Sequence, residues 1–295
     1  MNQFIDIIGS QMDLGASRKG VDMGPLAIRH ADLVYRLSCG GFTVKDKGDV
    51  IVAIPENAGD PKLRYKKEIC AANEALYHMV QQTLEYGHFP LIIGGDHSIA
   101  AGSVPAVARH YGSIGVIWID AHGDFNDETT SPSGNIHGMP LSAVCGLGPD
   151  CLIEYSPSRV SPQNVVIIGG RDLDPPEKAK LKANHVTVFP MSEIHSRGIL
   201  EVTKEAVAIA SRGTNGIHLS FDMDAIEPGE APGVGTPVEN GLSLRESFMA
   251  TEIIQASGKL LSMDLVEVNP LLDTRNRTGI LAVNIIMTAL GCTDY

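Results

Sequence analysis

The sequence predicts an α/β protein with three layers, in which helices cover both faces of a mainly parallel sheet of roughly eight strands. Two observations predict this class. Short apolar runs alternate along the chain with longer segments whose apolar residues recur three and four positions apart. Polar clusters directly follow several of the apolar runs, as expected where parallel strands end at one edge of a sheet. Because no linker or low-complexity segment separates these clusters, we expect residues 1–295 to form a single domain.

The expected strands are short and rich in β-branched and aromatic residues. A first strand is predicted at 4–8, and a weaker one follows at 42–45. The remaining six are expected at about 90–93, 115–119, 164–168, 186–189, 217–221 and 260–266. Their near-continuous apolar character is typical of strands that are buried on both faces of a parallel sheet.

The expected helices begin with one at 25–40, because Pro25 suits a first helical turn and Gly40 suits a helix end. The segment 65–86 has apolar residues at the three-and-four spacing of an amphipathic helix, and we expect its His78 to lie on the surface. Further helices are predicted near 98–110, 138–147, 175–184, 199–211, 243–257 and 278–290.

Bulk properties exclude several kinds of partner. The net charge is −12 and the isoelectric point is about 5.2, so the surface should repel nucleic acids and anionic lipids. No apolar run approaches the roughly 18 residues of a membrane helix, and the N-terminus lacks a signal-peptide pattern. We therefore expect no nucleic-acid partner, no membrane association and a cytoplasmic location.

Cysteine usage agrees with a reducing compartment. The five cysteines form no CxxC pair, and we expect reduced, partly buried thiols at Cys39, Cys70, Cys145, Cys151 and Cys292. The spacing of Cys145 and Cys151 is a weak indication of a disulfide or a metal site.

A cluster of chemistry-bearing residues follows the apolar run at 114–119. In an extended segment, alternate residues share a side, so Asp120, His122 and Asp124 can point into one pocket. Two carboxylates and an imidazole would repel or lose hydration there unless a cation lay between them, which favours a divalent metal. The alternative is a polar loop that caps the next helix.

Two further strand ends strengthen the metal interpretation. Asp222 and Asp224 follow the run at 216–221, and His97 follows the glycine turn at 94–95. Together these segments offer two imidazoles and four carboxylates without a thiolate, a set suited to hard or borderline divalent ions such as manganese. Six ligands exceed the need of one open catalytic ion and suit a pair of ions, two of the carboxylates bridging them.

Other candidate residues lie at the same expected edge. The loop 131–138 offers Ser133, Asn135 and His137, although a plain turn-rich loop is the alternative. Asp174 lies in the acidic segment after the strand expected at 164–168, and Glu267 follows the last strand.

Three motifs resemble the signatures of the ureohydrolase family, which includes arginases and agmatinases. They are GGDH at 94–97, DAHGD at 120–124 and SFDMDA at 220–225, and the resemblance covers nearly the whole chain. The segments SGNIHGMP at 133–140, APGVGTP at 231–237 and EVNP at 267–270 resemble the arginase branch in particular.

This resemblance implies a binuclear manganese enzyme that hydrolyses L-arginine to L-ornithine and urea, with two Mn²⁺ ions per subunit. It implies that Asp120 and Asp222 bridge the two ions. One ion would be completed by His97 and Asp124, and the other by His122 and Asp224.

The chemistry of guanidinium hydrolysis explains this residue set. A guanidinium is a poor electrophile, so hydrolysis needs a strong nucleophile such as a hydroxide held between two manganese ions. Glu267 would pair with the guanidinium, and Asp124 or His137 would carry a proton to the leaving amine. The resemblance further implies that the substrate carboxylate is bound by Asn126, Ser133 and Asn135, that the amino group is received by Asp174 and Glu177, and that Thr236 contributes to the wall near the guanidinium.

Alternatives remain at this point. The nearest is an agmatinase or another guanidino-compound ureohydrolase; a binuclear metallophosphatase and a catalytically silent arginine-binding protein are more distant. The resemblance also implies a homo-oligomer, a trimer or a hexamer, in which Arg245 and Glu246 could form ion pairs between subunits. The alternative for these two residues is a solvated helix face.

Overall fold

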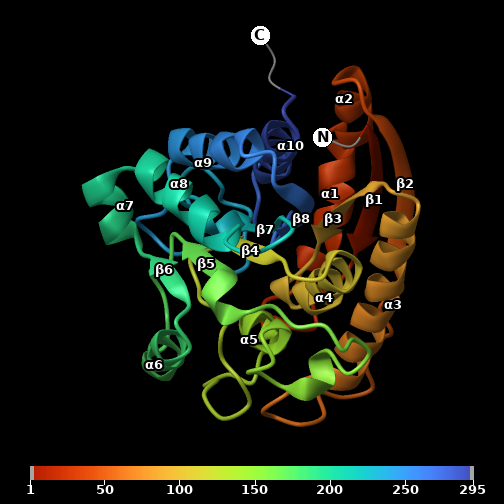
Figure 1. The fold of residues 1–295 in the computed structure, drawn as a ribbon. Helices are drawn as coiled ribbons and strands as arrows, with labels where there is room; N and C mark the ends of the chain where they lie inside the picture. The colour runs from red at the N-terminus through yellow and green to blue at the C-terminus, as the bar shows by residue number, and fades with distance from the viewer. Residues whose placement is uncertain (1–2, 293–295) are drawn as a thin grey trace.

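The computed structural model describes residues 3–292 and contains one eight-stranded parallel sheet between two layers of helices (Figure 1). The strand order across the sheet is β2-β1-β3-β8-β7-β4-β5-β6. The strands are β1 (Phe4–Ser10), β2 (Thr43–Val50), β3 (Phe89–Gly94), β4 (Gly115–Ile119), β5 (Val165–Ile168), β6 (Thr187–Phe189), β7 (Ile217–Asp222) and β8 (Leu260–Val266). The predicted fold class and all eight predicted strands are thus confirmed.

Helices α1, α2 and α7 to α10 cover one face of the sheet, and α3 to α6 cover the other (Figure 1). The helices are α1 (Gly24–His30), α2 (Leu33–Cys39), α3 (Lys66–Glu85), α4 (Ala100–Tyr111), α5 (Pro140–Val144), α6 (Pro175–Ala183), α7 (Met191–Arg197), α8 (Ile199–Ala210), α9 (Leu244–Ala256) and α10 (Arg277–Ala289). None of the helices among residues 3–292 is long and apolar enough to cross a membrane.

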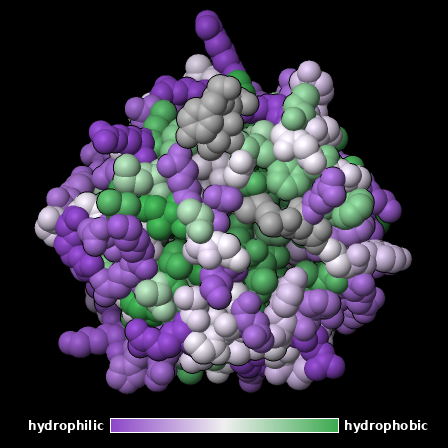
Figure 2. All heavy atoms as spheres, turned by 45° about the horizontal axis from the view of Figure 1, so that its top comes forward, coloured by the Kyte–Doolittle hydropathy of each residue, from purple (hydrophilic) through white to green (hydrophobic). Residues whose placement is uncertain are grey.

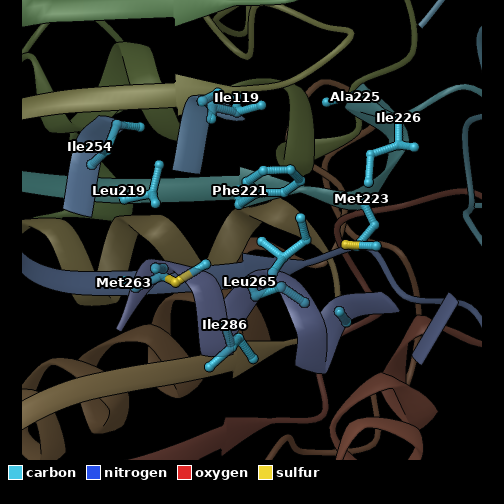
Figure 3. Close-up of a cluster of buried hydrophobic side chains, with 14 of the residues drawn as sticks. Ile119, Leu219, Phe221, Met223, Ala225, Ile226, Ile254, Met263, Leu265 and Ile286 are labelled. Atoms are coloured by element: carbon cyan, nitrogen blue, oxygen red, sulfur yellow. The ribbon is translucent and has the colours of Figure 1, made fainter. Parts of the chain in front are cut away.

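Each face of the sheet has its own hydrophobic core, because successive side chains of a strand point to opposite faces. In β4, Val116 and Trp118 pack toward α3 to α6, whereas Ile117 and Ile119 pack toward the other layer. Figure 3 shows the core between the middle of the sheet and helices α9 and α10. Strands β4, β7 and β8 contribute Ile119, Leu219, Phe221, Met263 and Leu265, and the two helices contribute Ile254 and Ile286. These central strands are therefore held rigidly up to their carboxyl ends.

Two predicted helices need correction, and one helix was not predicted. The helix expected at 25–40 is divided into α1 and α2 by Asp32, which adopts the left-handed conformation that an aspartate tolerates (φ 62°). The helix expected at 138–147 is only α5, and a short 3₁₀ turn precedes it. Helix α7 was not predicted, although Pro190 precedes it, Gly198 follows it, and Met191 and Ile194 are buried three positions apart.

Candidate active site and metal centre

The site lies where four adjacent strands, β3, β8, β7 and β4, end at the same edge of the sheet. His97 begins a 3₁₀ turn after β3, and Asp120 directly follows β4. Asp222 is the last residue of β7, and Glu267 directly follows β8. Residues far apart in the sequence therefore meet because the strand order in space differs from the order along the chain.

The first group of ligand-type atoms surrounds the imidazole of His97. Its Nδ1 atom lies 3.0 Å from Asp120 Oδ2, 3.1 Å from Asp124 Oδ2 and 3.1 Å from Asp222 Oδ2. All four side chains are buried. One nitrogen and three carboxylate oxygens thus converge on one small volume.

The second group surrounds His122. Its Nδ1 atom lies 3.1 Å from Asp224 Oδ2 and 3.4 Å from Asp120 Oδ1. Ligand atoms of His97, Asp120 and Asp222 all lie within 4.8 Å of one another, and so do those of Asp120, His122 and Asp224. Because Asp120 directs one oxygen at each imidazole, it can link two neighbouring cation positions.

The electrostatics of the cluster fit cations at these positions. Burial disfavours a protonated imidazole, but the neighbouring carboxylates outweigh burial and raise the pKa of His97 and of His122 well above the usual value. Burial, together with the charges of Asp224 and Asp120, raises the pKa of Asp222. The cluster therefore holds protons where divalent cations could replace them, and its oxygen and nitrogen donors suit two such ions.

Neighbouring side chains orient the candidate ligands. The Trp118 ring stacks on His97 with 3.8 Å between ring centroids, and its Nε1–H donates to Asp120 Oδ2 over 2.8 Å. Ser220 Oγ lies 2.8 Å from His97 Nε2. Sequence reasoning missed Trp118 and Ser220, although each stands two positions before an aspartate of the cluster and so shares its side of the strand. That alternation is the signal that could have found them.

Two residues of the site have unusual backbone conformations. Asp124 and Glu267 are both in the left-handed region, with φ of 49° and 66°. Residues other than glycine rarely adopt this region, and such strain concentrates at functional sites. Gly95 is needed for a different reason, since a Cβ atom there would lie 1.7 Å from the carbonyl oxygen of Met12.

A cavity of about 180 Å³ opens beside the two groups. It is lined by most of the predicted site residues, namely His122, Asp124, Asn126, Ser133, Asn135, His137, Asp174, Glu177, Asp222, Asp224 and Thr236. Ser131 and Asp172 also line it, and the sequence had not predicted either as a site residue. His97, Asp120 and Glu267 are buried next to these residues.

Glu267 and His137 form a pair at the cavity. His137 Nδ1 lies 3.1 Å from Glu267 Oε1, which also accepts a hydrogen bond from the backbone N–H of His97. Burial opposes protonation of His137, but the bond to Glu267 and the charges of Glu267, Asp96 and Asp124 raise its pKa to about 9. Glu267 Oε2 is buried without a hydrogen-bond partner among the described residues. A buried acceptor without a partner is costly unless a ligand donates to it.

Asn126 and Glu177 connect the cavity wall to α6. Asn126 Nδ2 donates to Asp174 Oδ2 over 3.1 Å, and Asn126 Oδ1 is buried without a partner in the described part of the chain. Glu177 accepts hydrogen bonds from the backbone N–H groups of Phe125 and Asp174, and it forms a capping box with Asp174 at the start of α6. Burial is the main cause that raises the pKa of Glu177 to about 7. In this arrangement Glu177 braces the wall of the cavity.

Thr236 has a similar bracing contact, because its Oγ1–H donates to Asp224 Oδ2 over 2.9 Å. On the opposite wall, Asn135 Nδ2 donates to Ser17 Oγ over 2.9 Å, and the Asn135 backbone N–H donates to Ser133 Oγ over 3.2 Å. Sequence reasoning missed Ser17, which only the folding of the first loop brings to Asn135.

The fold and the site together define an α/β enzyme of the kind that can bind two divalent cations at the carboxyl edge of a parallel sheet. The model of a family described as Arginase family matches residues 3–292. The chain belongs to the arginase family.

Relatives of known name agree over nearly the full length. The chain is 46% identical to an arginase of Bacillus subtilis over 294 residues, which are 99% of each protein. It resembles the solved structure of a Bacillus caldovelox arginase with a TM-score of 0.95 and 45% identity over 99% of each chain. It also resembles an Entamoeba histolytica arginase solved in complex with L-ornithine, with a TM-score of 0.92 and 30% identity over 98% of this chain and 99% of that one.

Proposed function

We propose that this protein hydrolyses L-arginine to L-ornithine and urea with the help of two manganese ions. The observation that carries the proposal is the double group of ligand atoms that shares Asp120 and lies beside the unpartnered acceptor of Glu267. The relative from Entamoeba histolytica, whose structure was solved with L-ornithine, supports the same chemistry.

The donor set supports two cation positions. His97 and Asp124 would hold one ion, His122 and Asp224 the other, and Asp120 and Asp222 would bridge them. The absence of thiolates and the excess of carboxylates favour manganese over structural zinc. When bound, a pair of such cations lowers the pKa of a water molecule and supplies an activated nucleophile.

Glu267 would orient the guanidinium of the substrate. A guanidinium is always protonated, and its planar N–H groups match a carboxylate in geometry and charge. Glu267 Oε2 has the free acceptor capacity for this contact, and the bond from the His97 backbone N–H to Oε1 fixes the carboxylate in place. The left-handed backbone at Glu267 would help to aim it.

Asp124 and His137 are the groups that could move protons. Without a bound cation, burial and the charge of Asp120 raise the pKa of Asp124 to about 6. As a ligand of one ion, Asp124 would lie beside the nucleophile, where a carboxylate can relay a proton. The pKa of about 9 keeps His137 protonated at neutral pH, ready to donate to the leaving amine. We propose that Asp124 or His137 delivers this proton.

The other end of the substrate would meet the polar cavity wall. Asn126, Ser133 and Asn135 would bind the α-carboxylate, directly or through water. The α-amino group would be received by Asp174, with Glu177 holding the wall behind it. Thr236 would keep Asp224 in place at the guanidinium end.

Replacing His137 with Asn should lower kcat by about 100-fold, the smaller end of typical losses for a general acid. Because the raised pKa keeps His137 protonated up to about pH 9, the loss should be largest at neutral pH and should shrink above pH 9. A series of urea-release rates across neutral and alkaline pH measures it, with the exposed His78→Asn as the matched control. Unchanged kcat at every pH would remove His137 from the mechanism.

We also propose assembly into a homo-oligomer, a trimer or a hexamer, in a cytoplasmic location. Exposed apolar side chains on α1, α2, α8 and α10, such as Leu26, Val34, Leu200 and Ile280, support an association surface. Figure 2 shows apolar side chains near the middle of one face, ringed by polar ones. Glu246 accepts hydrogen bonds from the backbone N–H and the hydroxyl of Ser243 at the start of α9. Its carboxylate is therefore already engaged within the subunit and is less available for an ion pair between subunits.

The proposed function is tested by urea release from L-arginine, using protein stripped of metal and then reloaded with manganese. We expect no urea from the stripped protein and full recovery with manganese, because the cluster cannot activate water on its own. Equal activity before and after reloading would contradict the metal requirement, and no urea under either condition would contradict the substrate.

A further inference from the structure

Two cysteines meet on the surface layer away from the cavity. Cys70 lies on α3, and Cys151 lies in the 3₁₀ turn Asp150–Leu152, 81 positions later in the chain. The Cys70 thiol donates a hydrogen bond to the backbone oxygen of Cys151, with 3.0 Å between Sγ and O. Both residues are partly exposed. The fold therefore places a second thiol next to each of them, within reach of small solutes.

The pKa values of the two thiols are shifted in opposite directions. The neighbouring Cys151 side chain, followed by burial, raises the pKa of Cys70. The neighbouring Cys70 thiol, opposed by burial and helped by the positive charge of Lys66, lowers the pKa of Cys151 to about 7. A lowered pKa increases the share of Cys151 present as thiolate, the form that attacks disulfides.

Cys145 and Cys39 have different surroundings. Cys145 is buried, and burial raises its pKa to about 12, so the Cys145 and Cys151 pairing suggested by the sequence is not the one that the fold favours. Cys39 is exposed at the end of α2, beside Tyr35. Cys70 and Cys151 thus stand apart as a pair.

We propose that Cys70 and Cys151 form a redox-sensitive dithiol, a modification site that small-molecule disulfides such as oxidised glutathione convert into an intramolecular disulfide. The Cys151 thiolate attacks one sulfur of the small disulfide, whose S–S bond breaks and releases one small thiol after it takes up a proton. Cys70 then loses its proton, attacks the Cys151 sulfur of the mixed disulfide and displaces the second small thiol. Two protein thiols are oxidised by two electrons, and one small disulfide is reduced to two thiols.

The crosslink would join α3 to the loop that follows α5. The segment before α3 already contacts the loop of Ser133 and Asn135, since the backbone N–H of Arg64 donates to Gly134 O over 3.1 Å. In a reducing compartment the disulfide would be transient, as is typical of redox-responsive sites.

The test treats the manganese-loaded full-length protein with oxidised glutathione, blocks remaining thiols and maps its peptides without reduction. We expect one linked pair of peptides containing Cys70 and Cys151, reversed by dithiothreitol. The Cys70→Ala variant should stop at glutathione on Cys151, and Cys39→Ala should form the crosslink as the wild type does. Only glutathione adducts, or links through other cysteines in the wild type, would overturn the proposal.

A second measurement is independent of the crosslink. The rate of Cys151 alkylation by iodoacetamide should rise with pH around a midpoint near 7, and the midpoint should move upward in Cys70→Ala because the neighbouring thiol that lowers the pKa of Cys151 is lost. A Cys151 that reacts no faster at neutral pH than buried Cys145 would contradict the proposal.

Discussion

Replacing Asp120 with Asn should lower kcat for urea release by about 1,000-fold or more, which corresponds to about 4 kcal/mol of transition-state stabilisation. Removing a residue that only hydrogen-bonds a metal ligand typically lowers metal affinity or activity 10–100-fold. Asp120 would itself be a ligand of both ions, so its loss should have a larger effect. Its two oxygens face His97 and His122 separately, and an amide offers only one oxygen and no charge. The variant should therefore also bind less manganese.

Metal analysis of the purified variant, beside its kcat, measures both effects. The matched control is Asp32→Asn, an exposed carboxylate between α1 and α2 whose left-handed conformation an asparagine also tolerates. Circular dichroism would show whether the Asp120 variant still folds. A folded variant with two manganese ions and wild-type turnover would contradict the bridging role of Asp120.

Agmatine should be hydrolysed with a kcat/KM at least about 10⁴-fold below that of L-arginine, because it lacks the α-carboxylate. A site that hydrogen-bonds a substrate group rejects an analogue without that group by about 10⁴ to 10⁵-fold. With agmatine bound, the polar groups of Asn126, Ser133 and Asn135 would lose their water without gaining a hydrogen-bond partner from the substrate. Parallel urea assays with both compounds measure the ratio.

The same assay can show which residues distinguish L-arginine from agmatine. Asn135→Ala should lower the rate with L-arginine and leave the rate with agmatine nearly unchanged. Asn164→Ala is a suitable control, because the Asn164 amide bonds to backbone oxygens of Ile209 and Arg212 near the end of α8. Similar turnover of both substrates by the wild type would contradict the assigned wall residues while sparing the fold and the metal centre.

Local patterns were sufficient to predict the strands and most helices. Most strands are apolar runs that both cores bury, so their composition differs sharply from the segments around them; the mostly exposed edge strand β2 is the exception. Helix α7 was missed because its seven residues bury only Met191 and Ile194, too few to show a helical period. The break at Asp32 was missed because α1 and α2 share one continuous helical composition, and the left-handed backbone of Asp32 that separates them has no clear sequence signal.

The residues of the candidate site also differ in whether the sequence alone could predict them. Asp120, Asp222 and Glu267 were predicted from their place at the ends of apolar runs, a local feature. Ser17, by contrast, reaches Asn135 only through the fold of the first loop. Cys70 contacts Cys151 only because α3 packs against the turn after α5, a contact that spacing in the sequence does not indicate.

The sequence by itself determined which residue types stand at the strand ends, since alternation of side chains within a strand is a local property of the chain. Only the tertiary structure decided that those ends meet. The order β3-β8-β7-β4 brings His97 within 3.1 Å of Asp222, 125 positions away, and it depends on how the helices of both layers pack on the sheet. Such long-range packing leaves no periodic signal in the sequence, so the distances within the site could be read only from the folded chain.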